Sequence, residues 1–232
     1  MPTDKYTIGR IRSIESRMLD ENKLLRMADA ESFQQAFNIL NETDYAPLLS
    51  KLNKPFDYEL MLEIALKELK YLSQTLAPNN KIIDVIWEKY DYENIKLLIK
   101  AKKKNIENPP LLPYGNIDPS LLKEHIMKEN GWLPKRLTNT IASAQHINDF
   151  LKMFDYVDQQ YLIYLKEVAA TENAPYLLSK SLLGKAKYKT DGNEPLVAFL
   201  FQKEAEIHKI GLILECKENF VPSEQIKQRV KK

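Results

Sequence analysis

The side chains that could carry chemistry are few and far apart in this sequence. The three histidines, His125, His146 and His208, fall on different predicted helices, and the single cysteine, Cys216, has apolar neighbours. The sequence has no Gly-rich loop followed by Lys-Ser/Thr, no His-Glu-x-x-His and no paired cysteines. Those patterns would indicate phosphate or metal chemistry. The sequence therefore predicts no catalytic residue, no metal site and no cofactor.

The most charged short stretch is residues 91–104, DYENIKLLIKAKKK. On a helix, four of its lysines share one side, opposite Ile95, Leu98 and Ile99: Lys96, Lys100, Lys103 and Lys104. Such a cluster could bind phosphates. However, no aromatic residue interleaves the lysines, and 34 Lys plus Arg face 32 Asp plus Glu in the chain. A polyanion binder has a strong basic excess. The near balance of charges predicts no nucleic-acid partner. Two interpretations of the lysines remain: a solvated face whose positive charges stabilise the C-terminus of the helix, or a protein contact at Lys96, Lys100 and Lys103.

Carboxylates near the apolar stripes are the other candidates. Asp91 lies four residues before Ile95, so it is either the N-cap of a helix that begins after a break near Tyr90 or part of an ion pair at a packing or partner surface. In QKEAEIHK (202–209), pairs three and four residues apart can form on one helix. Charges at the edge of an apolar stripe are costly unless paired, which makes Lys203 and Glu206 candidates for a contact between helical units. We therefore assign structural ion pairs or caps to five residues: Asp91, Asn94, Lys203, Glu204 and Glu206.

The elements that position these residues are helices, because apolar residues recur at helical spacing along the chain. Hydrophobic residues make up 44% of 232 residues, enough for a sizeable core, and six glycines are too few for an all-β fold. The spacing of apolar residues predicts an all-α multi-helix bundle without strands. Helices are expected over 6–19, 30–43 (capped by Asp29 or Ser32), 57–76, 81–104 with the break near Tyr90, 120–130, 135–170, 195–219 and 223–231 (capped by Ser223). The longest apolar run, 195–202, is too short to span a membrane. The first residues, MPTDKYTIGRIR, lack the apolar core that a signal peptide would have. One cysteine favours a reducing, cytoplasmic compartment.

Two internal similarities indicate a repeat. DYAPLLSK (44–51) resembles NAPYLLSK (173–180), and IKLLIKAKKKN (95–105) resembles IGLILECKEN (210–219). In the second pair a carboxylate, Asp91 or Glu206, stands four residues before the first isoleucine, and Cys216 aligns with Ala101, which favours a small buried residue. The repeat predicts two related helical units, an N-terminal one over 1–108 and a C-terminal one over 135–232. A linker with a short helix over 109–134 would join them.

Several of these segments resemble the C subunit of bacterial and archaeal V-type (A/V-type) ATPases, whose eukaryotic counterpart is the d subunit. The family's tyrosine-led first helix with Arg-x-Arg is matched by Tyr6, Arg10, Arg12, Glu15 and Leu19. Its central Asp-x-x-Asn-Leu-Lys motif and Leu-Leu-Arg-Ala-Lys core are matched by Asp91, Asn94, Lys96, Leu97, Leu98, Ala101 and Lys102, with Lys100 in place of the arginine. Its C-terminal motifs are matched by Lys203, Glu204, Glu206, Ile207, Lys217, Asn219 and Pro222, whereas Cys216 and Phe220 replace two glycines.

The resemblance implies a mechanical role. Members of the family are longer and resemble three helical units around a pseudo-threefold axis, whereas this chain offers two, and residues 111–170 match poorly. The implied function is that of a non-catalytic central-stalk socket, which couples the D and F subunits of the central axle to the membrane rotor ring of proteolipid subunits during proton or sodium transport. Such a protein is peripheral on the cytoplasmic face and meets the membrane only through the complex. ATP hydrolysis belongs to other subunits.

Two other functions stay open from the sequence. One is a stand-alone helical-repeat adaptor that binds proteins through a groove, and the other is a helical enzyme whose catalytic residues are too dispersed to form a motif. For the socket, the polar residues that core packing explains least are Tyr6, Arg10 and Arg12 near the N-terminus, together with Lys96, Lys100 and Lys103. We expect these six to contact neighbouring subunits.

Overall fold

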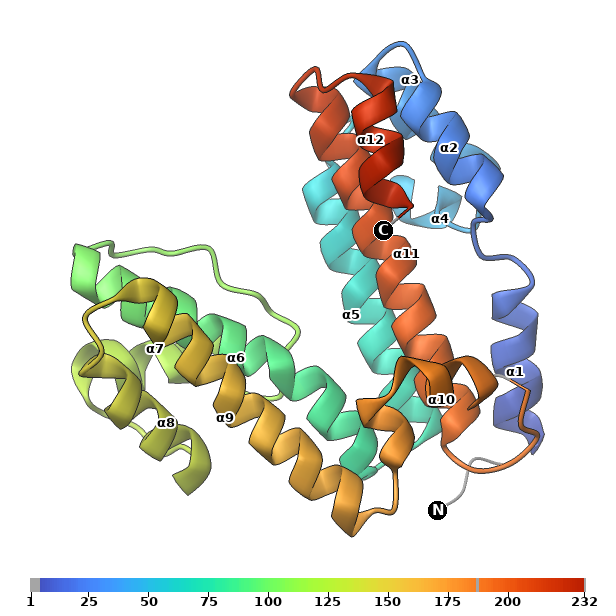
Figure 1. Cartoon of the computed structure of the whole chain (residues 1–232). Helices are drawn as coiled ribbons and strands as arrows, with labels where there is room; N and C mark the ends of the chain where they lie inside the picture. Colours follow the sequence, from blue (N-terminus) through green and yellow to red (C-terminus); the bar gives the residue numbers. More distant parts are fainter. Residues whose placement is uncertain (1–4, 187, 232) are drawn as a thin grey trace. The chain divides into compact units, whose positions relative to one another are not determined.

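The computed structural model describes residues 5–186 and 188–231, and within these ranges the chain forms helices and no β-strand (Figure 1). This confirms the predicted all-α fold. In chain order the elements are α1 (Lys5–Glu15), α2 (Glu21–Asp29), α3 (Phe33–Asn38), η1 (Ile39–Glu42), α4 (Ala46–Leu49), α5 (Tyr58–Leu76), α6 (Lys81–Lys104), α7 (Pro119–Lys128), α8 (Lys135–Gln145), α9 (Phe150–Thr171), η2 (Pro175–Leu178), α10 (Lys180–Ala186), α11 (Glu194–Glu218) and α12 (Ser223–Val230), where η1 and η2 are 3-10 helices.

Helix ends follow the predicted signals in part. Ser32 caps α3 by accepting a hydrogen bond from the Gln35 N–H at 3.2 Å, and α5 ends at Leu76, two residues before Pro78. Ser223 is not a cap, because α12 begins at Ser223 and its N-cap residue is Pro222. The Ser223 hydroxyl instead lies 3.0 Å from the Lys217 ammonium group and accepts a hydrogen bond from it.

The predicted break near Tyr90 is wrong, because α6 runs without interruption from Lys81 to Lys104. Buried residues occur on nearly every side of this helix, among them the polar residues Asp91 and Asn94. A helix that is enclosed all round does not show the one-sided apolar stripe of a surface helix. The weak stripe around Tyr90 therefore reflects burial of the whole helix rather than an interruption.

Internal contacts divide the chain into two compact units. Unit 1 is formed by the described residues up to Leu76 together with those from Leu183 onward, and unit 2 is Ala77–Leu182. The predicted boundaries at 108 and 134 both lie inside unit 2. The division differs because α5 packs against α11, which covers the apolar stripe of α5, so the two ends of the chain share one core.

Unit 1 is built on an antiparallel pair of long helices, α5 and α11 (Figure 1). The Tyr58 hydroxyl at the start of α5 lies 3.2 Å from the Glu218 carboxylate at the end of α11. The two helices approach closely at Gly211, where an added Cβ would lie 2.8 Å from the Leu62 side chain. Helices α1, α2, α3 and α12 pack on α11, so α11 is the central element of this unit.

Unit 2 has an antiparallel pair of its own, α6 and α9. Lys104 at the end of α6 lies over the ring of Phe150 at the start of α9, and the Tyr161 hydroxyl donates a hydrogen bond to the Val85 carbonyl oxygen at 3.3 Å. Helices α7 and α8 also pack against α6. The core between these four helices includes Ile95, Leu98, Ile99, Leu122, Ile126, Leu137, Ile141, Met153 and Val157.

Candidate functional site

Asp91 is a fully buried carboxylate in the middle of α6. Its oxygens accept hydrogen bonds from the backbone N–H groups of Asn116 at 2.8 Å and Ile117 at 3.1 Å. The next residue, Asp118, is the N-cap of α7. One of the two predictions made Asp91 the N-cap of its own helix, and this prediction is wrong. Asp91 fixes the segment that enters α7, because charge-assisted bonds to backbone amides compensate the cost of burying the carboxylate.

Glu206 is the counterpart of Asp91 in unit 1. It lies on α11, is 4% exposed and accepts a hydrogen bond from the Leu19 N–H at 2.8 Å. The residue after Leu19 is Asp20, the N-cap of α2. The Tyr45 hydroxyl and the Lys203 ammonium group donate to the other carboxylate oxygen of Glu206, at 2.7 and 2.5 Å. Burial, with the adjacent Glu206 charge, raises the pKa of Tyr45 well above its usual value, so Tyr45 stays a hydrogen-bond donor.

A lysine eleven residues after each carboxylate holds the other end of the same short helix. Lys102 donates to the carbonyl oxygen of Ile126 in α7 at 2.7 Å, and Lys217 donates to that of Ala30, the C-cap residue of α2, at 2.6 Å. In each unit the long helix therefore binds a short helix at both ends. We call this carboxylate–lysine arrangement the helix clamp.

The two helix clamps lie at the sequence similarity between 95–105 and 210–219. Asp91 and Glu206, like Lys102 and Lys217, are 115 residues apart in the chain, the offset of that similarity. Matching contacts on α6 and α11 support two related units. The similarity between 44–51 and 173–180 is different, because α4 precedes the long helix α5 whereas η2 follows α9.

The other predicted structural residues act within single units. The Asn94 side chain exchanges two hydrogen bonds with the backbone of Leu112, at 2.8 and 2.7 Å, and so attaches the loop before α7 to α6. Glu204 is buried in α11. The Lys203–Glu206 pair was predicted to contact the other helical unit, and Glu206 does bond to Leu19 and Tyr45, which lie in the predicted N-terminal unit over 1–108. Because the two ends of the chain share one core, this contact falls within unit 1 of the structure.

The lysine face of α6 is less solvated than the sequence predicted. Lys96 is 9% exposed, and its ammonium group lies 2.8 Å from the Glu93 carboxylate and 2.7 Å from that of Asp158 on α9. Burial opposes the charge, but the hydrogen bonds to Asp158 and Glu93 outweigh it and raise the pKa of Lys96. Lys103 donates to the Ile147 carbonyl oxygen. Lys100 is half-buried, with its ammonium group 5.9 Å from the centre of the Phe154 ring.

Charge reversal at Lys96 should therefore destabilise unit 2. In Lys96→Glu, three carboxylates would meet around a buried position, and we expect a loss of roughly 2–4 kcal/mol in the free energy of unfolding, as for other broken buried pairs. Lys100→Glu should cost at most about 1 kcal/mol, since it loses one partly exposed cation–π contact. Urea unfolding followed by circular dichroism measures both. Equal losses in the two variants would contradict this assignment of Lys96.

An arginine that the sequence analysis did not select joins three helices of unit 2. Arg136 on α8 forms an ion pair with Glu88, donates to the Tyr92 hydroxyl at 3.1 Å and stacks 3.3 Å over the Tyr164 ring. Burial raises the pKa of Tyr92 to about 12. No local spacing indicates this cluster, because its members come from α6, α8 and α9 and meet only in the folded chain.

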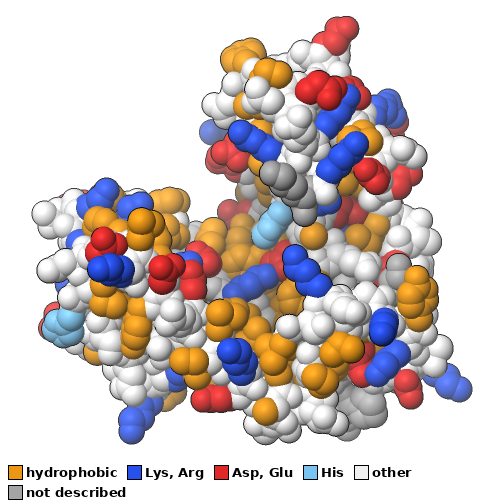
Figure 2. All heavy atoms as spheres, viewed as in Figure 1, with side chains coloured by type: hydrophobic (Ala, Val, Ile, Leu, Met, Phe, Trp, Pro, Cys, Tyr) orange, Lys and Arg blue, Asp and Glu red, His pale blue; other side chains and the backbone are white. Residues whose placement is uncertain are grey.

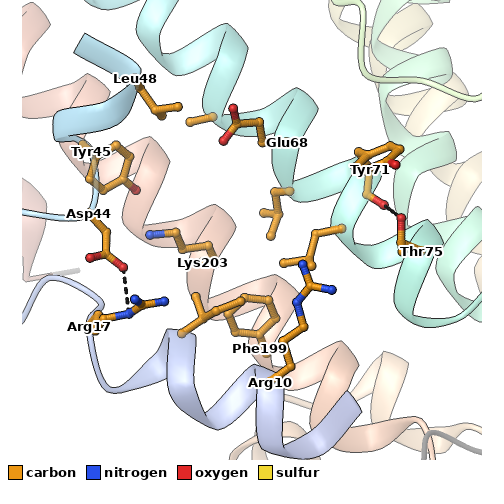
Figure 3. Close-up of a pocket in the computed structure, with 14 residues that line it drawn as sticks. Arg10, Arg17, Asp44, Tyr45, Leu48, Glu68, Tyr71, Thr75, Phe199 and Lys203 are labelled. Atoms are coloured by element: carbon orange, nitrogen blue, oxygen red, sulfur yellow. Dashed lines mark hydrogen bonds and ion pairs between the residues drawn. The ribbon is translucent and has the colours of Figure 1, made fainter. Parts of the chain in front are cut away.

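A groove in unit 1 is lined by one residue of the predicted partner set, Arg10. It has a volume of about 470 Å³ and lies between α1 and α5, with α11 beneath (Figure 3). Arg10 reaches into it from α1, while Tyr71 and Thr75 on α5 and Lys203 on α11 also line it. Two further charged groups at the groove are already paired: Arg17 with Asp44 at 3.1 Å, and Glu68 with Lys51 at 2.6 Å.

The N-terminal residues of the predicted partner set do not act alike. Tyr6 is 71% exposed, and Arg10 faces the groove. Arg12 is engaged within unit 1, because its guanidinium lies 2.6 Å from the Glu15 carboxylate. Tyr6 and Arg10 therefore fit a partner contact better than Arg12 does.

The fold defines the class: an all-α protein whose internal contacts form two compact helical units. The chain also matches the model of the family described as ATP synthase (C/AC39) subunit, over residues 7–178 and 114–229. The chain belongs to this family. The two matched ranges overlap at 114–178. Of the described helices, none combines the length and apolarity needed to cross a bilayer.

Relatives named as the C subunit of A-type ATP synthase match nearly the whole chain. The protein from Pyrococcus horikoshii is 28% identical over 96% of this chain and 58% of its own length. The protein from Methanosphaera stadtmanae is 26% identical over 97% of this chain and 57% of its own. The protein from Methanocaldococcus jannaschii is 32% identical over 51% of this chain and 32% of its own. The chain thus spans somewhat over half the length of the relatives that match it throughout.

Proposed function

We propose that the protein is a non-catalytic subunit of an A-type or V-type rotary ATPase, which passes torque between the D and F subunits of the axle and the proteolipid ring of the membrane rotor. The observation that carries the proposal is the family match along residues 7–229. In this role the protein is peripheral, lies on the cytoplasmic side and reaches the membrane through the complex, whose transported ion is a proton or sodium.

The helix clamps support this function physically. A part that transmits torque must resist deformation, and each clamp ties a short helix at both ends to the central helix of its unit. Buried, fully bonded charges fix one arrangement of their partners, because any shift leaves a charge without compensation. The surface in Figure 2 mixes Lys and Arg with Asp and Glu, which favours protein contacts over polyanion binding.

Copurification tests the proposal. We expect an affinity-tagged chain, purified in mild detergent from its own cells, to bring down the axle subunits and the proteolipid in fixed ratio. Arg10→Glu, in the groove, should lower the yield of these partners, whereas Lys67→Glu, on the exposed surface of α5, should not. Elution of the chain without rotor subunits would contradict the proposal.

The groove between α1 and α5 favours one alternative, a stand-alone adaptor that binds a segment of another protein. It predicts a different partner in the same purification, with the same dependence on Arg10.

A further inference from the structure

The turn after α11 contains a phenylalanine, Phe220, whose side chain the fold of unit 1 does not require. Phe220 has a φ of 57° and is 93% exposed. Its counterpart in unit 2, 115 residues earlier, is Asn105, with a φ of 54°. Both long helices end in the same way, since the Ile106 N–H bonds to the Ala101 carbonyl oxygen at 2.9 Å and the Val221 N–H to that of Cys216 at 2.8 Å.

Comparison of the two turns shows which residue types the backbone conformation of the turn requires. A left-handed residue at this point of a helix end is usually glycine or asparagine, because a short polar side chain tolerates the conformation. Asn105 meets that requirement. Phe220 does not, because a bulky side chain at positive φ is an outlier and its ring is almost wholly in water. Outliers of this kind persist at functional positions, so the exposed ring needs an explanation outside unit 1.

A cavity of about 700 Å³ lies beside Phe220, between the turn that joins α2 to α3 and the turn that joins α11 to α12. Three carboxylates line it: Asp29, Glu31 and Glu218. Asp29 is paired with Lys227 at 2.6 Å, whereas Glu31 and Glu218 form no ion pair with any described residue. The lysine of this cavity, Lys217, is directed to the Ala30 carbonyl oxygen and the Ser223 hydroxyl. The cavity therefore keeps a negative charge beside an exposed aromatic ring.

We propose that Phe220 and this cavity bind a lysine- or arginine-bearing segment of a partner protein. The cationic side chain would stack on the Phe220 ring and pair with Glu31 and Glu218, which line the same cavity. Aromatic residues, Phe among them, are enriched at protein interfaces, and the carboxylates select a basic partner by charge complementarity. They also disfavour anionic lipids and nucleic acids. The inference goes beyond the proposed function, since it would hold for any partner of this chemistry.

Photo-cross-linking in the full chain tests this inference directly. A benzoylphenylalanine placed at position 220 in the protein's own cells should give one main adduct, identified by mass spectrometry, on a segment in which Lys and Arg outnumber Asp and Glu. The adduct yield should fall severalfold when Glu31→Gln and Glu218→Gln are combined. The same probe in place of Leu151, which is 74% exposed in unit 2, should not give this adduct and is the matched control.

The results separate this inference from the proposed function. A basic segment of another ATPase subunit supports both, while a basic segment of an unrelated protein supports the docking site and contradicts the ATPase role. The docking site is contradicted by an adduct on a second copy of this chain, on lipid or on a segment without basic excess. It is equally contradicted by the absence of an adduct, or by a yield that the two substitutions leave unchanged.

Phe220→Asn gives an independent test, because it copies the turn of unit 2. We expect the urea midpoint to stay the same or rise, while recovery of the cross-linked partner protein in copurification falls about tenfold, as for loss of an interface anchor. A lower urea midpoint would assign Phe220 a structural role, and unchanged recovery would remove it from the interface. Either result would overturn the proposal.

Discussion

Replacing Glu206 with alanine should lower the free energy of unfolding by about 3–5 kcal/mol, the range found when one partner of a buried ion pair is removed. The substitution leaves three donors without an acceptor: the Leu19 N–H, the Tyr45 hydroxyl and the Lys203 ammonium group. The loss exceeds that of an ordinary helix cap, about 1 kcal/mol, because Glu206 is 4% exposed and water cannot replace it.

Urea unfolding of matched variants measures this effect. Glu206→Gln keeps the shape and one acceptor oxygen, so its loss should be intermediate. Glu63→Ala breaks the solvent-exposed pair with Lys67 and should change the free energy of unfolding by at most about 0.5 kcal/mol. If Glu206→Ala and Glu63→Ala were equally stable, the clamp on α2 would contribute nothing to unit 1.

Replacing Gly115 with alanine should be similarly damaging in unit 2, with an expected loss of about 3 kcal/mol or more. The added Cβ would lie 1.9 Å from an Asp91 carboxylate oxygen. The carboxylate must then move, which disrupts its bonds to Asn116 and Ile117. Overpacking alone typically costs about 1–3 kcal/mol, and buried amides left unpaired cost about as much again.

A double-mutant cycle tests the cause of this loss. In the Asp91→Ala background the colliding side chain is absent, so Gly115→Ala should cost clearly less than in the natural chain. Some cost remains, because the same Cβ would also lie 3.1 Å from the Asp91 backbone nitrogen. Gly9→Ala is the control, since nothing lies within 4 Å of a Cβ added in α1. It should stabilise by up to about 1 kcal/mol through helix propensity. An identical cost of Gly115→Ala in both backgrounds would exclude the carboxylate as its cause.

Periodicity was sufficient to predict most of the longer helices, such as α5 and α9, because their apolar stripes are fixed by the local sequence. The short helices α2, α4 and α10 were not predicted. Periodicity was also not sufficient for α6 at Tyr90, where a helix enclosed by α7, α8 and α9 loses its polar side. The unit boundaries were also out of reach. Contiguous halves are the simplest interpretation of a repeat, whereas the packing of α1, α2, α3 and α5 on α11 makes unit 1 discontinuous.

The predicted structural residues were better identified than their partners. Charges beside an apolar stripe must be paired, and this argument selects Asp91, Lys203 and Glu206 from the sequence alone. Their partners include the backbone N–H groups of Leu19, Asn116 and Ile117, which carry no side-chain signal, and the hydroxyl of the distant Tyr45. For the same reason, Lys217 and Lys102 were noted for their place in the motifs, and their roles at the ends of α2 and α7 appear only in the structure.

The discontinuity of unit 1 sets an order for folding during synthesis. Unit 2 is continuous in the chain, so it can fold as soon as Leu182 has left the ribosome. Helices α1 to α5 emerge earlier, yet α11, which covers their apolar faces, follows only after unit 2. At typical rates of synthesis, roughly 100 intervening residues take about 5–20 s. The apolar stripe of α5 is therefore exposed to chaperones throughout that interval, and the first part of the chain to be made is the last to become native.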